Sequence, residues 1–134
     1  MDLYWRNSIM NKYIIQAVAA LATNVNPFDP VIKPVISNIV IGDIQGRSVV
    51  ITALISASGF YTTLVASKGI TTEYELGQGD NSIIPSDLDS NSVNVLVQFI
   101  IEALEFSTTY HIRLEATNEN GTTYSDDIEV RTLS

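Results

Sequence analysis

The feature that most constrains this chain is the strict alternation of apolar and polar residues from Thr109 to Thr117. Successive side chains of a strand point to opposite sides of a sheet, so each set lies on its own face. The apolar set is Tyr110, Ile112, Leu114 and Ala116; the polar set is His111, Arg113, Glu115 and Thr117. Asn120-Gly121 suits a tight turn, and Ile128, Val130 and Thr132 continue the inward face. This region predicts a β-hairpin with one buried face.

Upstream of the hairpin, the sequence consists of short β-rich runs separated by turn residues. The expected strands are 36–41, 48–56, 60–67, 70–76 and 93–101, followed by the hairpin strands 109–117 and 122–132. Residues 77–90 read as a polar loop. Seven strands at this spacing are typical of a β-sandwich.

Two segments carry a family resemblance. Gly69-Ile70-Thr71-Thr72-Glu73-Tyr74 resembles the segment that follows strand C in fibronectin type III domains of bacterial and phage surface proteins, and the run from Thr109 to Tyr124 resembles the strand F and G signature of the same domains. The resemblance implies an all-β, seven-stranded immunoglobulin-like sandwich. It also implies that Tyr110 forms a tyrosine corner, with its hydroxyl bonded to the preceding corner. Ala66 and Lys68 depart from the family, which usually has aromatic residues there.

The N-terminal part has a different pattern. Apolar residues recur at helical spacing, which predicts an amphipathic helix that begins near Asn7 or Ser8. The stripe consists of Leu3, Met10, Ile14, Ala17 and Leu21. Pro27, Pro30 and Pro34 then indicate an extended spacer. We expect a helical arm and linker at 1–34 and a sandwich at 35–134. The stripe could be covered by its own sandwich or by another chain, and the spacer favours another chain.

The run from Tyr13 to Ala22 is superficially similar to a secretory signal. Gln16 interrupts the apolar run, and we expect that it is not a signal. The run is also shorter than the roughly 20 apolar residues of a membrane span.

Composition excludes several function classes. Fifteen acidic residues and seven basic ones give a formal net charge of −8, which disfavours nucleic acid binding. The basic residues are also scattered singly. The sequence has no cysteine, so disulfides and thiolate chemistry are impossible.

Three motifs carry possible chemistry. His111 is the only histidine, and no hydroxyl nucleophile accompanies it, so a solvated sheet face is the favoured interpretation. Asp87, Asp89 and Asn91 alternate as in a calcium loop, but Ser92 and Gln98 replace the glycine and glutamate that an EF-hand requires. The run 77–80, Gly-Gln-Gly-Asp, lacks the Lys-Ser/Thr of a phosphate loop. We therefore expect no enzyme, metal or cofactor.

The favoured function is that of a structural protein of a phage virion. It would be an accessory capsid (decoration) or tail component, docked through its N-terminal arm on other virion proteins or on copies of itself. The alternative is a secreted or surface-attached bacterial module for adhesion or carbohydrate binding. Glycan binding stays open in that alternative, with no motif that supports it.

Overall fold

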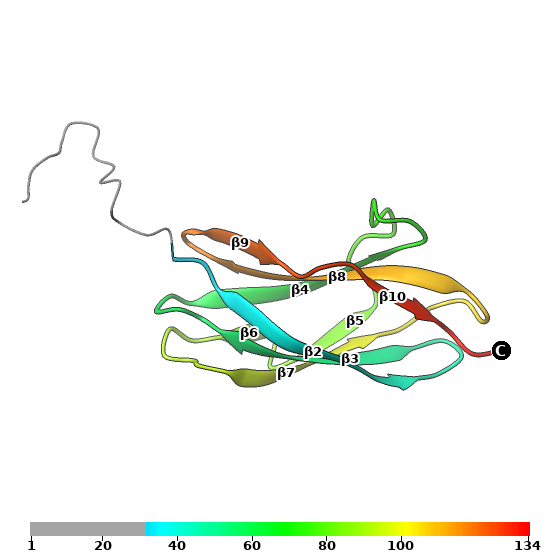
Figure 1. Ribbon diagram of the computed structural model, residues 1–134, viewed down its shortest axis with the longest axis horizontal. Helices are drawn as coiled ribbons and strands as arrows, with labels where there is room; N and C mark the ends of the chain where they lie inside the picture. Colours follow the sequence, from blue (N-terminus) through cyan, green and yellow to red (C-terminus); the bar gives the residue numbers. More distant parts are fainter. Residues whose placement is uncertain (1–31) are drawn as a thin grey trace, which may run out of the picture. The chain divides into compact units, whose positions relative to one another are not determined.

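The computed structural model describes residues 32–134, which form a β-sandwich of nine antiparallel strands and contain no helix (Figure 1). One sheet has the order β2-β3-β7-β5, and the other has the order β10-β8-β4-β6, with β9 also paired to β8. The strands of the first sheet are β2 (Val35–Ile44), β3 (Val49–Ser56), β7 (Val95–Ile101) and β5 (Asn81–Ile84). Those of the second are β10 (Ile128–Arg131), β8 (Thr109–Asn118), β4 (Thr62–Gly69), β6 (Asp87–Leu88) and β9 (Gly121–Tyr124).

The core lies between the two sheets and is built from alternate strand positions. On β8 the predicted inward set from Tyr110 to Ala116 is buried, and on β3 Val49, Ile51, Ala53 and Ile55 are buried as well. Phe99 of β7 is the largest fully buried side chain of the described residues. Full burial of such a side chain contributes about 1.5–3 kcal/mol. The period-two pattern is therefore confirmed where it was most regular.

The expectation of seven strands is wrong for one segment, residues 70–76. This segment is a succession of turns instead of a strand. The Glu75 carboxylate accepts hydrogen bonds from the backbone N–H groups of Ile70 and Thr71, and Tyr74 has a φ of 53°. Local side-chain bonds thus replace a sheet ladder here. Conversely, the expected polar loop 77–90 contains two short strands, β5 and β6.

The expected return strand 122–132 is divided into β9 and β10 by an interruption at Ser125. The Ser125 hydroxyl accepts a hydrogen bond from the backbone N–H of Leu114, a position that a regular ladder would fill with a backbone carbonyl. The interruption brings Asp127 onto the outer face beside His111. The strand expected at 93–101 begins at Val95, because Asn94 has a φ of 50° and interrupts the extended backbone.

The described part begins with three residues that join the sandwich before β2. The carbonyl of Ile32 accepts hydrogen bonds from the side-chain amides of Asn118 and Asn120, and that of Pro34 accepts one from Thr123. Contacts divide the chain into the units Met1–Val31 and Ile32–Ser134. The predicted helix and most of its linker lie outside the described residues.

Candidate interaction surfaces

Apart from Asp43, which lies at an irregularity near the end of β2, the outer face of the β2-β3-β7-β5 sheet carries no charged side chain at its outward strand positions. Leu96 is 63% exposed, Val40 is 56% exposed and Ile84 is 55% exposed. We call this surface the uncharged face. Its outward positions are Val35, Ser37, Val40, Val50, Thr52, Leu54, Ser56, Ser82, Ile84, Leu96, Gln98 and Ile100. A sheet face in contact with water is normally polar, so this face is a candidate contact surface.

Strand register assembles the apolar residues of this face. Leu54 of β3 is paired with Leu96 of β7, and Val50 is paired with Ile100. In the central row, Val40 is paired with Thr52, which is paired with Gln98, and Gln98 with Ile84. A β-bulge between Ser37 and Val40 keeps Val40 on the outside.

Acidic residues border one end of the uncharged face. Asp43, Asp80 and Glu102 are exposed and directly flank the paired positions Ile44, Asn81 and Ile101. The backbone N–H of Glu102 donates to the carbonyl of Asp80 at 2.9 Å. The outward positions at the other end are Val35 and Ser56. The face therefore has an acidic end and a neutral end.

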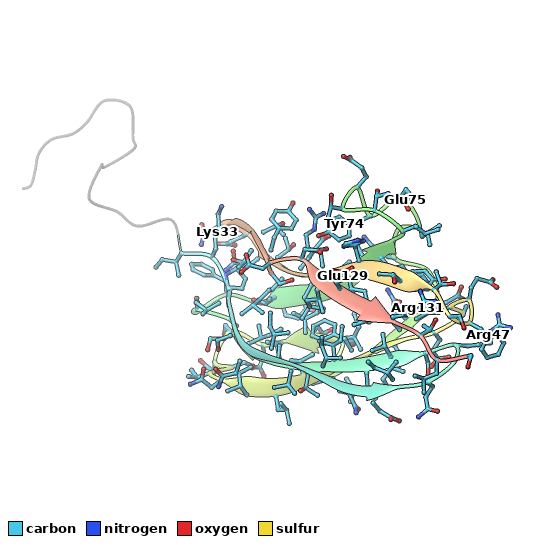
Figure 2. All side chains as sticks on the ribbon, turned by 45° about the vertical axis from the view of Figure 1, so that its right-hand side comes forward. Lys33, Arg47, Tyr74, Glu75, Glu129 and Arg131 are labelled. Carbon is cyan, nitrogen blue, oxygen red and sulfur yellow. The ribbon has the colours of Figure 1, made fainter. Side chains whose placement is uncertain are left out.

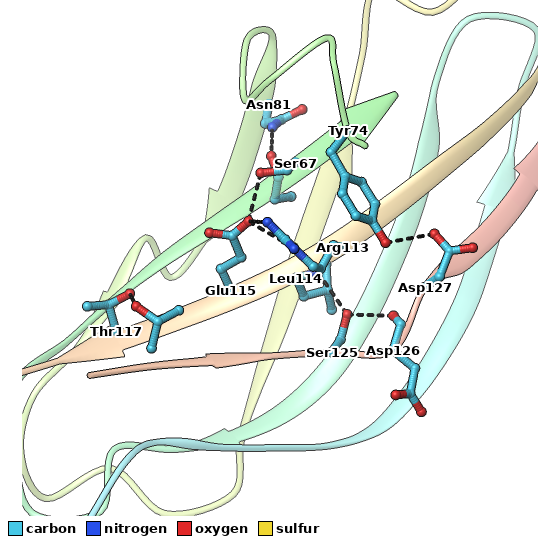
Figure 3. A network of polar contacts seen from close by, with 12 residues as sticks. Ser67, Tyr74, Asn81, Arg113, Leu114, Glu115, Thr117, Ser125, Asp126 and Asp127 are labelled. Atoms are coloured by element: carbon cyan, nitrogen blue, oxygen red, sulfur yellow. Dashed lines mark hydrogen bonds and ion pairs between the residues drawn. The ribbon is translucent and has the colours of Figure 1, made fainter. Parts of the chain in front are cut away.

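The opposite sheet presents a polar network centred on Arg113, shown in Figure 3. The Arg113 guanidinium lies 4.6 Å from the centroid of the Tyr74 ring and 4.3 Å from that of the Tyr124 ring. It also donates from Nη2 to Glu115 Oε2 at 3.0 Å, and the same oxygen accepts a bond from Ser67 Oγ at 2.9 Å. A guanidinium between two aromatic rings is a stabilising cation–π arrangement. We call these residues, with His111 and Asp127, the Arg113 cluster.

Asp127 completes the Arg113 cluster. Its Oδ1 accepts a bond from the Tyr74 hydroxyl at 2.9 Å, and its Oδ2 lies 2.7 Å from His111 Nδ1 (Figure 3 for Tyr74). Because an ionised carboxylate only accepts, the His111 Nδ1–H is the donor. This hydrogen bond raises the pKa of His111 above its ordinary value. Burial, and then the bond to Asp127, raise the pKa of Tyr74.

The Arg113 cluster fastens the turn segment 70–76 to the outer face of β8. Figure 2 shows Tyr74 and Glu75 on this segment, beyond the sheet that carries Glu129 and Arg131. Each ionised member bonds to another member, and the cluster contains no nucleophile with a base and an oxyanion site. Its chemistry is therefore that of a structural clamp. The sequence placed His111, Arg113 and Glu115 on one face but did not bring Tyr74, Tyr124 or Asp127 to them.

Lys68 faces inward on β4 and is only 6% exposed. Its ammonium group donates to the Glu102 carbonyl at 2.9 Å at the edge of the core. Burial lowers the pKa of Lys68, and the nearby Asp80 carboxylate opposes this effect. The residue thus occupies a core position where the family resemblance implied an aromatic one, and it reaches a polar partner through its long stem.

A shallow cavity of about 320 Å³ lies at one end of the second sheet. It is lined by Phe60, Tyr61, Thr63, Thr117, Asn118 and Glu119. The Tyr61 hydroxyl donates to Asp87 Oδ2 at 2.8 Å. Aromatic rings beside hydroxyl groups and a carboxylate can hold a small polar ligand.

The structure places the predicted site residues as follows. The Tyr110 hydroxyl is buried and accepts a hydrogen bond from the backbone N–H of Glu105 at 2.8 Å, the contact that defines a tyrosine corner. The arm residues Leu3, Met10, Ile14, Ala17 and Leu21 lie outside the described residues.

Asp87, Asp89 and Asn91 do not converge on a common point. Asp87 accepts a bond from Tyr61, whereas Asp89 Oδ1 accepts one from Ser92 Oγ at 3.1 Å. Within residues 32–134, no three histidine, aspartate or glutamate side chains are grouped so that they could hold a metal ion. The run 77–80 is a connection before β5. The part of the chain that the structure describes has no helix that could cross a membrane.

The uncharged face was missed by sequence reasoning, although its signal was present. On β3 and β7 the positions between the buried ones are Val50, Thr52, Leu54, Leu96, Gln98 and Ile100, without a single charge. The sequence predicted that buried and outward residues alternate along these strands. Because the outward residues are uncharged as well, they could have been interpreted as a second contact face.

Comparison with known proteins defines the class of this protein by its fold: a fibronectin type III-like, immunoglobulin-like β-sandwich. The FN1–FN3 domains of chicken CNTN1 superpose with a TM-score of 0.52 at 21% identity, over 75% of this chain and 34% of that one. This chain therefore spans about a third of the CNTN1 fragment. The sensor domain of the anti-sigma factor RsgI4 of Pseudobacteroides cellulosolvens superposes with a TM-score of 0.51 at 14% identity, over 77% of this chain and 76% of that one.

No family model matches the sequence, and no curated protein matches it. At these identities the similar structures support the fold alone.

Proposed function

We propose that this chain is a non-enzymatic structural protein that acts through protein–protein contacts as a component of a phage virion. It would serve as an accessory capsid or tail protein, with its N-terminal arm docked on a neighbouring subunit. The single observation that carries the assembly role is the uncharged face. Single exposed apolar residues are ordinary, but two apolar pairs on adjacent strands, Leu54–Leu96 and Val50–Ile100, on a face almost without charge are typical of a surface that another protein covers.

The virion setting is supported by the sequence resemblance to surface domains of bacteria and phages and by the arm that precedes the sandwich. An arm with an apolar stripe and a second apolar surface on the sandwich would give each copy two attachment points. Two weak contacts hold a subunit on a particle far longer than either alone. The stripe residues Ile14 and Leu21 would serve the first contact, and Leu54 and Leu96 the second.

A second candidate function is that of a surface-attached or secreted bacterial binding module. The observation that favours it is the shallow cavity lined by Phe60 and Tyr61, which could accept a sugar ring or another small polar ligand. In that case the uncharged face would be a contact between neighbouring domains.

The test is the location of the chain among the products of phage infection. Density-gradient-purified particles of the phage whose genome carries this sequence should contain the chain at a fixed ratio to the major capsid or tail protein. Leu96→Asp should reduce that ratio, whereas the control Leu133→Asp, at a residue that is 54% exposed but off the uncharged face, should not. Recovery of the chain only in the bacterial envelope or the medium would contradict the virion role and favour the second candidate.

A further inference from the structure

We infer that the occupant of the uncharged face is a second copy of this chain, packed face to face about a two-fold axis. This inference rests on the proposed function and names the partner of its surface. Three features of the molecule carry it: the distribution of charge, the position of the acidic end, and the size of the face.

The charge distribution favours this face for contact between copies. Each chain carries a formal net charge of −8, so two copies repel one another over most approaches. The outward positions of β3, β7 and β5 are free of charge, and β2 carries only Asp43, near its end. This sheet is therefore where acidic copies can meet with few carboxylates in the contact. The opposite sheet carries side chains of both charge signs outward, among them the Arg113–Glu115 pair and Glu129, so a face-to-face contact there would have to bury ionised groups.

The acidic end of the face fixes how the two copies are oriented. A two-fold axis parallel to the strands would bring Asp43, Asp80 and Glu102 of one copy onto the same residues of the other. If the axis instead lies in the interface plane and perpendicular to the strands, the acidic end of each copy lies over the neutral end of the other copy, where Val35 and Ser56 are. The strand length of about 24 Å then separates the two acidic groups by more than the screening length of about 8 Å. We therefore infer the second arrangement, with strands of the two copies running antiparallel.

The contacts of this arrangement are self-complementary, as a two-fold interface requires. The Leu54–Leu96 pair lies on one side of the central row and the Val50–Ile100 pair on the other. Reversing the strand direction places the first pair of one copy over the second pair of the other. Thr52 and Gln98, in the central row, would face their own counterparts, with side chains able to hydrogen-bond one another.

The size of the face predicts a weak, concentration-dependent dimer. Strand spacing and rise give the face a projected area of roughly 450 Å² per copy, and roughly 900 Å² for the pair. This is the size of transient interfaces, below that of permanent dimers. Such a contact forms where copies are concentrated, as they are on the surface of a particle.

The test is sedimentation equilibrium of the full chain at protein concentrations from roughly 10 μM to 1 mM. The wild-type chain should pass from monomer to dimer. Gln98→Glu adds one charge at an exposed central position and should weaken association at least about tenfold, because the two introduced carboxylates face each other. Gln78→Glu, the same change at an exposed position in the connection before β5, should leave association unchanged. Equal melting curves of the two variants check that both are folded.

Other outcomes overturn the inference. A wild-type chain that stays monomeric at 1 mM, or a dimer that Gln98→Glu leaves intact, excludes the second copy on this face. A dimer lost with Ile14→Asp/Leu21→Asp but kept with Gln98→Glu assigns association to the arm instead. The proposed function is tested separately. If Gln98→Glu reduces incorporation into particles while the wild-type chain is monomeric in solution, the proposed function holds and this inference fails, because the face is then a docking surface for another virion protein. A chain that dimerises through this face but is absent from particles upholds this inference and overturns the proposed function.

Discussion

The guanidinium of Arg113 lies 4.3 Å from the centroid of the Tyr124 ring, and the ring of Tyr74 contacts it as well. Tyr124 belongs to β9, whereas Tyr74 belongs to the turn segment 70–76. One side chain of β8 therefore joins two segments that the backbone ladder does not connect. The turn segment is thus held by this side chain in addition to the backbone bonds that join Leu76 and Gly77 to Lys68 of β4.

Arg113→Ala should lower the free energy of unfolding by about 1–2 kcal/mol, because it removes two cation–π contacts and the pair with Glu115. Arg113→Lys should give an intermediate loss, since an ammonium lacks the planar surface that packs between the rings. Hydrogen exchange should become faster in residues 70–77. Arg131→Ala, at an exposed position of β10, is the control and should change neither quantity appreciably.

The tyrosine corner makes a second prediction. Tyr110→Phe should fold in the same way but lose about 1–2 kcal/mol, because the N–H of Glu105 loses its acceptor. Urea denaturation of the two proteins measures the difference. An unchanged denaturation midpoint would show that the bond is not stabilising.

The pair of His111 and Asp127 should make stability depend on pH. Asp127, then Glu129 and Glu75, favour the protonated imidazole, so the folded pKa of His111 lies above the unfolded value near 6.5. The folded state then binds the proton more tightly, and this contribution is fully present below about pH 6.5. It is lost as pH rises through the folded pKa. The difference in unfolding free energy between wild type and His111→Gln should therefore shrink as pH rises from about 5 to 8. A difference that grows with pH would contradict the assigned pair.

Calcium should have no appreciable effect on the melting temperature. Asp87 and Asp89 each accept a bond from a different side chain, Tyr61 and Ser92, and so they do not offer a shared site. Differential scanning fluorimetry with millimolar calcium and with a chelator measures this. A calcium-dependent rise of several degrees would show that the loop rearranges around the ion.

The sequence predicted the regular parts of the fold because burial of alternate residues leaves a visible pattern. The inward faces of β3 and β8 follow from alternation alone. Residues 70–76 were mistaken for a strand because their β-branched and aromatic composition is typical of strands. This composition does not reveal that the Glu75 carboxylate binds the backbone of its own turn. The interruption at Ser125 was not predicted either, because it also depends on a bond between a side chain and the backbone, from the N–H of Leu114 to the Ser125 hydroxyl.

The surfaces were harder to predict than the core. The Arg113 cluster combines distant residues such as Tyr74 and Asp127, which are 53 positions apart and which only the strand order brings together. The uncharged face likewise combines four strands, of which β5 was expected to be part of a loop. A buried set is visible within one strand, whereas a surface requires the register between strands.

The boundary of the sandwich gives the last prediction. A chain that begins at Val31, without residues 1–30, should keep the full unfolding free energy of the sandwich, because the core and the apolar residues packed against it lie within residues 36–130. A chain that begins at Val35 should be less stable by about 1–2 kcal/mol, because the buried amide of Asn118 loses its bond to the Ile32 carbonyl, and Thr123 loses its bond to Pro34. The two truncated chains differ by four residues. Asn118→Ala in the chain that begins at Val31 should reproduce most of the loss in unfolding free energy. In the phage system the chain that begins at Val31 should also fail to enter particles, as should the full-length variant Ile14→Asp/Leu21→Asp. A truncated chain that folds and is incorporated normally would assign attachment to the sandwich alone.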